Sequence, residues 1–474
     1  MSAWDARRLA AASGAELLRD GGGEAREEPP SAAVDTRALR PGELFVGLAG
    51  EREDGGARAA EALAGGAWGV LVSPQHAPGA VAAAERLGAT ADEPAGTVLV
   101  HPRPLQALQR LASAWREELA SAGARVVAVT GSTGKTSTKD ILAALLAGAM
   151  PTAASPANLN TEIGLPLAVL DAPAGTRALV LEMAMRGRGQ IAELTEIAAP
   201  DVGVIVNVGP AHLELLGSLE AIAAAKAELI AGLRPGSKAV VPAGELLLQA
   251  HMRPELETVT FGAGGDVRLL EGGPDGRVRI DAGGELVELE PSFRQAHNLC
   301  NLLAAVAAAR ALGVHPSGRL QVTFSAMRGQ RAELPSGVLL IDDCYNANPM
   351  SVRAAIDDLA AEAGEGREGR HLRSVAVLGD MLELGPSGPA LHREIGEHAR
   401  RQGVGLLVTV GPLAAAVAQG FGGESHTLAD AARAAEVVPQ LVGAGDVVLV
   451  KGSRGVGLER VAEALREAVP AGQR

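Results

Sequence analysis

Short apolar runs alternate along this chain with longer stretches in which apolar residues recur every three or four positions. Runs of Val, Ile and Leu bounded by Gly, Pro or polar residues are typical of buried strands, whereas the longer spacing is typical of amphipathic helices. Strands that are apolar along their whole length suit a parallel sheet with helices on both faces. The alternation of the two patterns therefore predicts an α/β protein.

The first section of the chain, residues 1–120, mixes both patterns. We predict strands at FVGL, GVLVS and TVLV, and helices at AAEALAGG and LQALQRLASAWREEL. The opening stretch MSAWDARRLAAASGAELL is predicted to be one amphipathic helix. Because the section contains neither a phosphate-binding loop nor a cluster of catalytic residue types, we expect it to hold a substrate.

The second section, residues 121–316, opens with a β-branched strand, RVVAVT, then a Gly-rich turn and the helix STKDILAALLAG. RALVLEMA and DVGVIVNVG are further strands of a predicted parallel sheet. From about residue 238 the pattern changes, and we expect short antiparallel strands at KAVV, TVTFG, VRLLEG, RVRIDAG and ELVELE. A helix is predicted from His297 onward. This section is expected to be a P-loop, ATPase-like domain.

The third section, residues 317–474, returns to alternating strands and helices. GVLLIDDCYN, SVAVLGD, LLVTVG and VVLVKGS are its predicted strands. They predict a second open α/β sheet, of Rossmann-like type. The pattern as a whole therefore predicts three α/β domains.

Composition narrows the class of protein. At 474 residues the chain is long enough for several domains, and with 2% aromatic residues the cores must consist of Ala, Val and Leu. A net charge of -13 argues against a nucleic-acid-binding protein. The two cysteines, Cys300 and Cys344, form no paired motif, which favours a reducing cytoplasm. The apolar runs are too short to span a bilayer. We expect a cytoplasmic monomer without membrane insertion.

The stretch from Gly131 to Thr136, GSTGKT, has the form of a phosphate-binding loop, although Val129 stands where the usual pattern has its first glycine. Such a loop points backbone N–H groups at phosphate oxygens, its lysine reaches the outer phosphates, and its hydroxyl binds Mg²⁺. Val129 lies on the strand side of the turn and need not disturb this arrangement. The expected phosphate contacts are Gly131, Ser132, Thr133, Gly134, Lys135, Thr136 and Ser137. An ordinary Gly-rich turn, a kinase or an NTP-driven regulator remains an alternative at this point.

Candidate metal ligands follow the neighbouring strands. Glu182 ends ALVLE, and His212 follows VIVNVGPA, so both are expected beyond the carboxyl edge of the sheet, near the loop. Lys226 falls within an apolar helical stripe of SLEAIAAAKAELI. It either extends its amine to water or is buried with a lowered pKa, in which case the amine can react with carbon dioxide to form a carbamate.

Further motifs follow in the same order as in a known family. They are VDTRALRPGELFVGLAGEREDG, VTGSTGKTST, NLNTEIGLPLAVL, LEMAMRGRGQI, NVGPAHLELLGSLEAIAAAKAEL, AHNLCN, IDDCYNANPMS, VLGDMLELG and LVKGSRGVGLE. Together they resemble the Mur ligases, the ATP-dependent amide ligases of peptidoglycan synthesis, over nearly the whole chain. Val129 is normal in that family. The last three motifs resemble the branch that uses D-alanyl-D-alanine.

The resemblance implies roles for particular residues. The implied catalytic residues are Lys135, His212 and Lys226. The implied metal ligands are Thr136, Glu182, His212 and a carbamylated Lys226. Implied nucleotide contacts, beyond the loop, are His297, Asn298, Asn301, Arg331 and Asp343. Implied substrate contacts are Asp35, Thr36, Arg37, Asn158, Asn160, Thr161, Tyr345, Asn346, Asn348, Lys451, Ser453 and Arg454.

The reaction that the resemblance implies joins D-alanyl-D-alanine to UDP-N-acetylmuramoyl-tripeptide. ATP would phosphorylate the peptide carboxylate, two Mg²⁺ ions would assist this transfer, and the dipeptide amine would then displace the phosphate. The alternatives are a sister Mur ligase or a folylpolyglutamate synthase, and, outside the superfamily, a catalytically inactive binding protein. The YNANP and KGSRG segments favour the ligase that uses D-alanyl-D-alanine over a sister Mur ligase or a folylpolyglutamate synthase.

Overall fold

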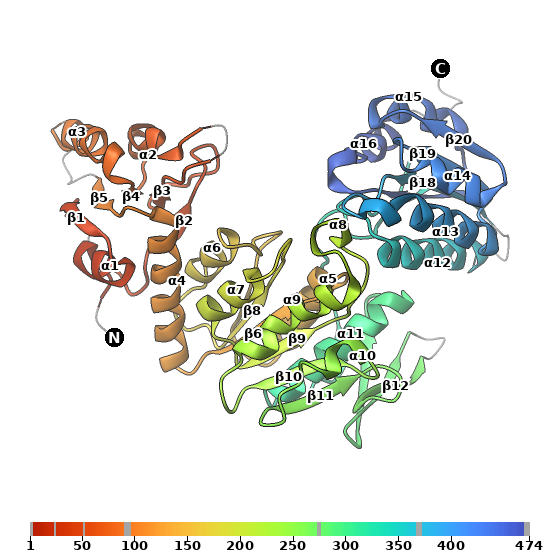
Figure 1. Cartoon of the computed structure of the whole chain (residues 1–474), viewed down its shortest axis with the longest axis horizontal. Helices are drawn as coiled ribbons and strands as arrows, with labels where there is room; N and C mark the ends of the chain where they lie inside the picture. The colour runs from red at the N-terminus through yellow and green to blue at the C-terminus, as the bar shows by residue number, and fades with distance from the viewer. Residues whose placement is uncertain are drawn as a thin grey trace.

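In the part of the chain that the structure describes, three β-sheets follow one another, each with helices packed against it (Figure 1). The computed structural model describes residues 3–22, 25–50, 53–89, 96–272, 276–365 and 372–468. The expected α/β class is confirmed. We call the parts built around the three sheets the first, central and third units.

The first unit contains a sheet with the strand order β1-β5-β4-β3-β2, in which β1 is antiparallel to β5 and the other pairs are parallel. Its strands are β1 (Glu16–Arg19), β2 (Ala32–Ala33), β3 (Leu44–Val46), β4 (Gly69–Val72) and β5 (Thr97–Val100). Its helices are α1 (Ala6–Ser13), η1 (Gly55–Arg58), α2 (Ala59–Ala64), η2 (Pro74–His76) and α3 (Ala77–Gly88).

The prediction of one continuous N-terminal helix was wrong. α1 begins after Asp5, whose carboxylate accepts a hydrogen bond from the backbone N–H of Arg8, and it ends at Ser13. Gly14 then takes a left-handed conformation with φ 69° and closes the helix, as glycine commonly does at this position. The residues after it pair with β5 as the edge strand β1, so cross-strand pairing outweighs the helical spacing.

Helix α4 (Pro104–Ser121) joins the first unit to the central one (Figure 1). The indole of Trp115 is buried in a core that contains residues of both units. Its Nε1–H donates to the backbone oxygen of Ala172 at 2.9 Å, and its ring meets that of Trp4 edge to face, with centroids 6.0 Å apart. One helix therefore fixes the first unit onto the central one.

The central sheet has the strand order β15-β14-β13-β12-β11-β10-β9-β6-β8-β7. Its strands are β6 (Arg125–Thr130), β7 (Thr152–Ala154), β8 (Ala178–Glu182), β9 (Val202–Ile205), β10 (Lys238–Pro242), β11 (Glu257–Phe261), β12 (Val267–Gly272), β13 (Val278–Ala282), β14 (Glu285–Pro291) and β15 (Gly318–Leu320). Its helices are α5 (Lys135–Ala147), α6 (Gly164–Leu170), α7 (Gln190–Ala198), α8 (Leu213–Leu216), α9 (Leu219–Gly232), α10 (Leu246–Gln249) and α11 (Ala296–Ala311).

Strand β6 shows why the central strands of this sheet are apolar along their whole length. Val126 and Ala128 belong to a core that also contains residues of α7 and α9, whereas Val127 and Val129 belong to a second core, with residues of α5 and α11. Successive side chains of a strand point to opposite faces, and helices cover both faces here. Val129 is fully buried on the strand, as expected.

The five strands expected to be antiparallel are only partly so. β10 is parallel to β9 and to β11, while β12, β13 and β14 pair in antiparallel fashion. The reason lies in the connections. The chain crosses through α10 between β10 and β11, which suits parallel pairing, whereas Gly283 and Gly284, both with positive φ, form a tight turn between β13 and β14.

The third sheet has the strand order β16-β17-β21-β18-β19-β20, with β16 antiparallel at one edge and the other pairs parallel. Its strands are β16 (Gln330–Glu333), β17 (Leu339–Asp342), β18 (Arg373–Gly379), β19 (Leu406–Val410), β20 (Ser425–Leu428) and β21 (Asp446–Lys451). Its helices are α12 (Pro349–Glu365), η3 (Gly385–Ser387), α13 (Gly388–Arg401), α14 (Ala415–Phe421), α15 (Ala431–Leu441), η4 (Arg454–Val456) and α16 (Glu459–Glu467).

The change from the central to the third sheet falls later than the expected boundary at residue 316. β15 lies beyond that point but pairs with β14, so the third sheet starts only at β16. None of the helices in the described ranges combines the length and the apolar character that a bilayer crossing requires.

The role of α4 yields a first prediction. Trp115→Phe removes the indole N–H and leaves the buried oxygen of Ala172 without its donor, which costs about 1–3 kcal/mol. We expect a lower midpoint of thermal unfolding, measured by circular dichroism. Trp68→Phe, at a partly exposed indole in the first unit, is the control and should change the midpoint much less. Equal midpoints for the two variants would contradict the role given to α4.

Candidate functional site

A cavity of about 890 Å³ lies between the central and third units. Its walls come from the Gly-rich loop, the ends of β8 and β9, the first turn of α11 and the segment that leads into α12. Figure 1 shows α8 of the central unit beside the third unit. Residues far apart in the sequence thus share one site.

The Gly-rich loop connects β6 to α5. Gly134 has φ 78°, and a Cβ at this position would clash with Oδ1 of Asn301, so glycine is required on both counts. No side chain in the described ranges caps the first turn of α5. The loop therefore presents helix N-terminal N–H groups to the cavity, which is the arrangement that binds phosphate.

Asn207, which follows β9, holds the first half of this loop. Its Oδ1 accepts hydrogen bonds from the backbone N–H groups of Ser132 at 3.1 Å and Thr133 at 3.0 Å, and its Nδ2 donates to the oxygen of Thr133 at 3.0 Å. One side chain thereby satisfies three backbone groups. The remaining N–H groups, at the start of α5, stay directed to the cavity.

Lys135 lines the cavity and is the first residue of α5. Its Nζ donates to the backbone oxygen of Gly131 at 2.9 Å. Burial lowers the pKa of this amine, and the nearby Glu182 carboxylate opposes that shift. A buried cation without a close ion pair favours an anionic ligand, because the ligand would offset its desolvation.

Glu182 is the last residue of β8 and is 1% exposed. Its Oε1 accepts from Nδ2 of Asn160 at 2.7 Å, whereas its Oε2 is buried and has no hydrogen-bond partner among the described residues. Thr136, also buried, lines the same cavity. A buried carboxylate oxygen without a donor is the expected state of a metal ligand, so this pair fits a hard cation.

His212 lines the cavity, and its Nδ1 contacts the carboxylate of Glu383 from the third unit. Burial lowers the pKa of this imidazole, and the contact with Glu383 partly offsets the shift. Among the described residues, no three His, Cys, Asp or Glu side chains are grouped as a metal site. The expected set has only two residues of these types, which suits an ion that takes other ligands from phosphate and water, as Mg²⁺ does.

Lys226 lies on α9 and is 2% exposed, so its amine does not extend into water. Burial lowers its pKa well below the usual value, and the charge of Lys135 adds to this shift. Among the described residues we find no hydrogen-bond or ion-pair partner for it. Lys226 stands behind the cavity wall rather than in it. Leu219, the first residue of the same helix, is 38% exposed, so the apolar stripe is not buried along its whole length.

The third unit adds a polar segment to the cavity. Nζ of Lys451 donates to Asp343 at 2.7 Å and to the backbone oxygen of Asn346 at 2.9 Å. The guanidinium of Arg328 lies 3.9 Å from the centre of the Tyr345 ring. Nδ2 of Asn348 donates to the oxygen of Ser132 at 3.3 Å, which ties this segment directly to the Gly-rich loop.

Most of the candidate residues meet at this one cavity. Those that line it are Ser132, Thr133, Gly134, Lys135, Thr136, Ser137, Asn160, Thr161, Glu182, His212, His297, Asn301, Asp343, Tyr345, Asn346, Asn348 and Lys451. Those that do not line it are Gly131, Asn158, Lys226, Asn298, Arg331, Ser453, Arg454 and the first-unit residues Asp35, Thr36 and Arg37.

Several candidates outside the wall support it instead. Nδ2 of Asn301 donates to Oδ1 of Asn298 at 3.2 Å, so Asn298 orients a residue that touches the loop. Arg331 pairs with Asp358, at 2.6 Å, and with Glu362. The hydroxyl of Ser453 accepts from the N–H of Leu382. Arg454 lies 3.8 Å from Glu459.

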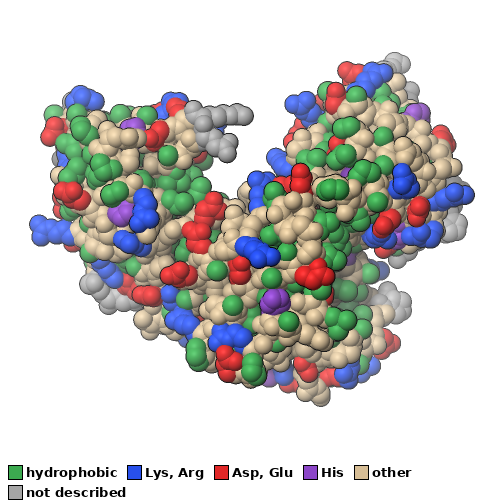
Figure 2. Space-filling view, in the orientation of Figure 1, with side chains coloured by type: hydrophobic (Ala, Val, Ile, Leu, Met, Phe, Trp, Pro, Cys, Tyr) green, Lys and Arg blue, Asp and Glu red, His purple; other side chains and the backbone are tan. Residues whose placement is uncertain are grey.

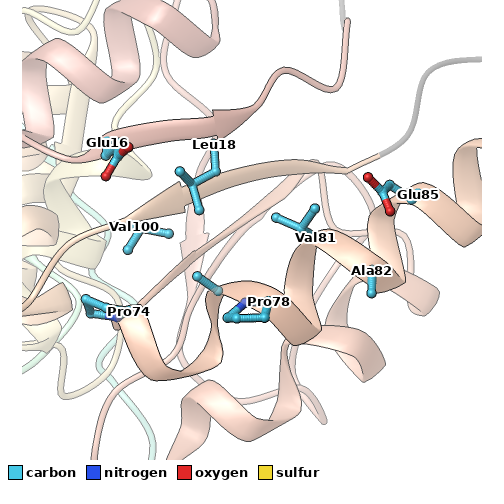
Figure 3. Close-up of a pocket in the computed structure, with 9 residues that line it drawn as sticks. Glu16, Leu18, Pro74, Pro78, Val81, Ala82, Glu85 and Val100 are labelled. Atoms are coloured by element: carbon cyan, nitrogen blue, oxygen red, sulfur yellow. The ribbon is translucent and has the colours of Figure 1, made fainter.

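The first-unit candidates lie apart from this cavity; Arg37 is exposed, and Asp35 and Thr36 are half-buried. Arg37 pairs with Asp35 at 2.6 Å and lowers the pKa of that carboxyl to about 2, while Thr36 donates to Glu61. A separate cavity of about 480 Å³ lies in this unit, between β1 and α3. Figure 3 shows residues that line it. Its lining is mainly apolar, and Glu16 and Glu85 are its charged groups, so it does not suit an anionic ligand.

Some side chains at or beside the site were not singled out from the sequence, among them Asn207, Arg328 and Glu383. Asn207 lies inside NVGPAH and follows a strand, as His212 does, so its position at the sheet edge was a usable signal. Glu383 lies in VLGDMLELG, and only the docking of two units brings it to His212.

Comparisons with known proteins agree with this geometry. Residues 129–309 match the Mur ligase middle domain, and residues 327–454 match the Mur ligase, glutamate ligase domain. The UDP-N-acetylmuramoyl-tripeptide–D-alanyl-D-alanine ligase of Bacillus subtilis (strain 168) is 35% identical, over 92% of this chain and 93% of that protein. The chain belongs to the Mur ligase family.

Solved structures of Mur ligases are similar over nearly the whole chain. A crystal structure of MurF from Acinetobacter baumannii covers 99% of this chain and 100% of its own, with a TM-score of 0.80 and 27% identity. The MurF ligase of Thermotoga maritima in complex with ADP covers 92% of this chain and 97% of its own, with a TM-score of 0.73 and 31% identity. The three-unit arrangement is therefore that of a Mur ligase.

The position of Asn207 yields a second prediction. Asn207→Ala removes three hydrogen bonds that hold the loop, each contributing about 1 kcal/mol, and we expect roughly tenfold or greater loss of affinity for a nucleoside triphosphate. Isothermal titration calorimetry measures this loss. Gln249→Ala, at an exposed amide at the end of α10, should bind as the wild type does. Unchanged affinity of the Asn207 variant would show that the loop needs no such support.

Proposed function

We propose that this Mur ligase joins D-alanyl-D-alanine to UDP-N-acetylmuramoyl-tripeptide, with hydrolysis of ATP to ADP and phosphate. The observation that carries the proposal is the meeting of the Gly-rich loop, Glu182 and the segment from Tyr345 to Asn348 at one cavity. The names of the relatives support this choice of substrates. The UDP-N-acetylmuramoyl-tripeptide–D-alanyl-D-alanine ligase of Escherichia coli (strain K12), for example, is 32% identical over 92% of this chain.

The chemistry must first activate a carboxylate. A carboxylate is a poor electrophile, because its negative charge is delocalised and its oxide is a poor leaving group. Transfer of the γ-phosphoryl group of ATP to a carboxylate oxygen gives an acyl phosphate and ADP. The dipeptide amine then attacks the carbonyl carbon, and the tetrahedral intermediate collapses to the amide and inorganic phosphate, with loss of the amine proton.

The Gly-rich loop carries groups that reduce the repulsion between the phosphates of ATP and the peptide carboxylate. The N–H groups at the start of α5 bind phosphate oxygens, and the amine of Lys135 neutralises charge on the group in transfer. Both act in a cavity closed on one side by Asn348, whose amide reaches the loop from the third unit. Exclusion of water from this cavity protects the acyl phosphate from hydrolysis.

Thr136, Glu182, His212 and Lys226 are the residues that would hold Mg²⁺, of which we propose two ions. When bound, Mg²⁺ reduces the charge repulsion between nucleotide and carboxylate. The unpartnered oxygen of Glu182 is the feature of this chain that best fits such a role. Lys226 fits only in a modified form, because an amine in its cationic state repels a metal.

We propose that Lys226 is carbamylated. Its burial favours the neutral amine, which attacks the carbon of carbon dioxide; an N–C bond forms and the nitrogen loses a proton. The product carries carboxylate-like oxygens, so an anion takes the place of the neutral amine. An anion suits the position of Lys226 near the positive charge of Lys135.

The two other substrates are assigned to the outer units. We propose that Asp35, Thr36 and Arg37 of the first unit contribute to holding the UDP-sugar, with Asn158, Asn160 and Thr161 along the path to the cavity. Tyr345, Asn346, Asn348, Lys451, Ser453 and Arg454 are the proposed contacts on the dipeptide side, and His297, Asn298, Asn301, Arg331 and Asp343 those of the nucleotide. Figure 2 shows a wide hollow between the first and third units, which leaves room for a long substrate.

The proposed function has consequences for the oligomeric state and the location of the protein. We propose that the protein works as a monomer. Cys300 and Cys344 are both free thiols, which supports a cytoplasmic location. The three units serve different substrates, and catalysis requires that the third unit dock on the central one.

The reaction itself is the third prediction. With ATP, Mg²⁺ and UDP-N-acetylmuramoyl-tripeptide, we expect sustained phosphate release and an amide product of the predicted mass only when D-alanyl-D-alanine is present. Lys135→Ala should abolish both, whereas Lys238→Ala, at the distant pair with Glu257, should not. Phosphate release that does not depend on the dipeptide would indicate an ATPase, and a phosphorylated end product would indicate a kinase; either result contradicts the proposal.

The state of Lys226 is the fourth prediction. Lys226→Ala should lose most of the ligase activity, and a small carboxylate such as formate should restore part of it by taking the place of the carbamate. In the wild-type protein, ¹³C-bicarbonate should give a carbamate carbon signal by NMR that is missing from the variant. Full activity of the variant, or a wild-type spectrum without that signal, would rule out the modification.

A further inference from the structure

Two residues with an unusual backbone meet where the central and third units touch. His212 has φ 59° and Glu383 has φ 61°, and both belong to the five non-glycine residues with positive φ in the described ranges. A left-handed conformation is unfavourable for residues with a Cβ and persists only where the surroundings impose it. That two such residues contact each other directly points to a function for the contact.

Glu383 contacts the central unit through both its side chain and its backbone. Its carboxylate contacts Nδ1 of His212 and lies 3.5 Å from the guanidinium of Arg186, which follows β8. Its backbone oxygen accepts a hydrogen bond from the N–H of Glu214 at 3.0 Å. Gly385 packs against Glu214 so closely that a Cβ would touch its backbone. The side chain and the backbone thus hold the same junction.

The loop that carries Glu383 is fixed inside the third unit. Nε2 of the buried His392 accepts from the N–H of Met381 at 2.9 Å, while the hydroxyl of Ser453 accepts from the N–H of Leu382 at 3.0 Å. Asp380, at the start of the loop, accepts from the N–H of Ala414 at 2.6 Å. Three consecutive residues before Glu383 are therefore anchored, and they aim its carboxylate out of the third unit.

We propose that Glu383 is a positioning residue for the ligase reaction: it fixes the ring of His212 when the third unit docks. A carboxylate at Nδ1 holds the tautomer with the proton on that nitrogen, which leaves the lone pair of Nε2 free for a ligand. Since Glu383 belongs to the third unit, His212 has this orientation only in the docked arrangement. Docking and completion of the site are thereby one event.

This inference rests on the proposed function, and its test separates the two. Glu383→Ala removes the carboxylate, and Glu383→Gln keeps one oxygen that can accept from Nδ1–H. Glu394→Gln is the matched control, because it removes a carboxylate of the same unit that pairs with Arg353. Circular dichroism establishes that each variant is folded.

Two readouts are required. For Glu383→Ala we expect kcat to fall roughly 10- to 100-fold, with the KM values for ATP and the dipeptide changing less than about threefold. Glu383→Gln should recover part of kcat. In ¹⁵N-histidine-labelled protein without metal, the His212 ring signals, assigned with His212→Gln, should show the Nδ1–H tautomer in the wild type and a tautomer mixture in Glu383→Ala.

Each alternative result overturns the proposal. A kcat of Glu383→Ala equal to that of the wild type would show that Glu383 has no role in the reaction. Unchanged ring signals of His212 would show that Glu383 does not position it, even with a low kcat. If Glu383→Ala does not fold, Glu383→Gln carries the test, and a kcat and ring signals equal to those of the control reject the idea. If the wild type lacks ligase activity, the proposed function fails. The positioning of His212 is then tested by the NMR comparison alone, and equal ring signals in the wild type and in Glu383→Ala would reject it.

Discussion

The structure depends on one electrostatic constraint: negatively charged groups have to be brought together in one cavity. The described wall of that cavity carries the buried amine of Lys135, the N–H groups of α5 and the carboxylate of Glu182 with one oxygen unpaired. A buried anion and a buried cation are each costly when alone. A phosphate group at the amine, and the metal ion that we propose at the carboxylate, would offset this cost.

The same constraint explains why the site lies between two units. A site within one domain would have to open and close by loop movement, whereas here the third unit provides a whole wall. Asn348 reaches the loop through the oxygen of Ser132, and Glu383 reaches His212. Helix α4, in contrast, shares a continuous core with both the first and central units. The chain therefore has one extensively packed junction and one held by a few polar contacts, and the second is where the chemistry is proposed.

Much of this could be predicted from the sequence, because the signals were local. The Gly-rich loop follows a strand and opens a helix, so the residues around it were enough to predict it, although Asn207 supports its first half. Val129 is a buried strand residue, as expected. The direction of β10 and β11 was mispredicted, because direction depends on which strands become neighbours. The end of α1 was missed because pairing of β1 with β5 is decided far along the chain. Glu383 could not be assigned, since its partner belongs to another unit.

The central claim is that the peptide carboxylate is phosphorylated before the amide forms. The most direct measurement uses UDP-N-acetylmuramoyl-tripeptide labelled with ¹⁸O in its terminal carboxylate and follows the isotope in the phosphate released during ligation. The account predicts that a labelled oxygen passes from the carboxylate to inorganic phosphate with each amide bond formed. Released phosphate without the label, at a normal rate of ligation, would contradict it.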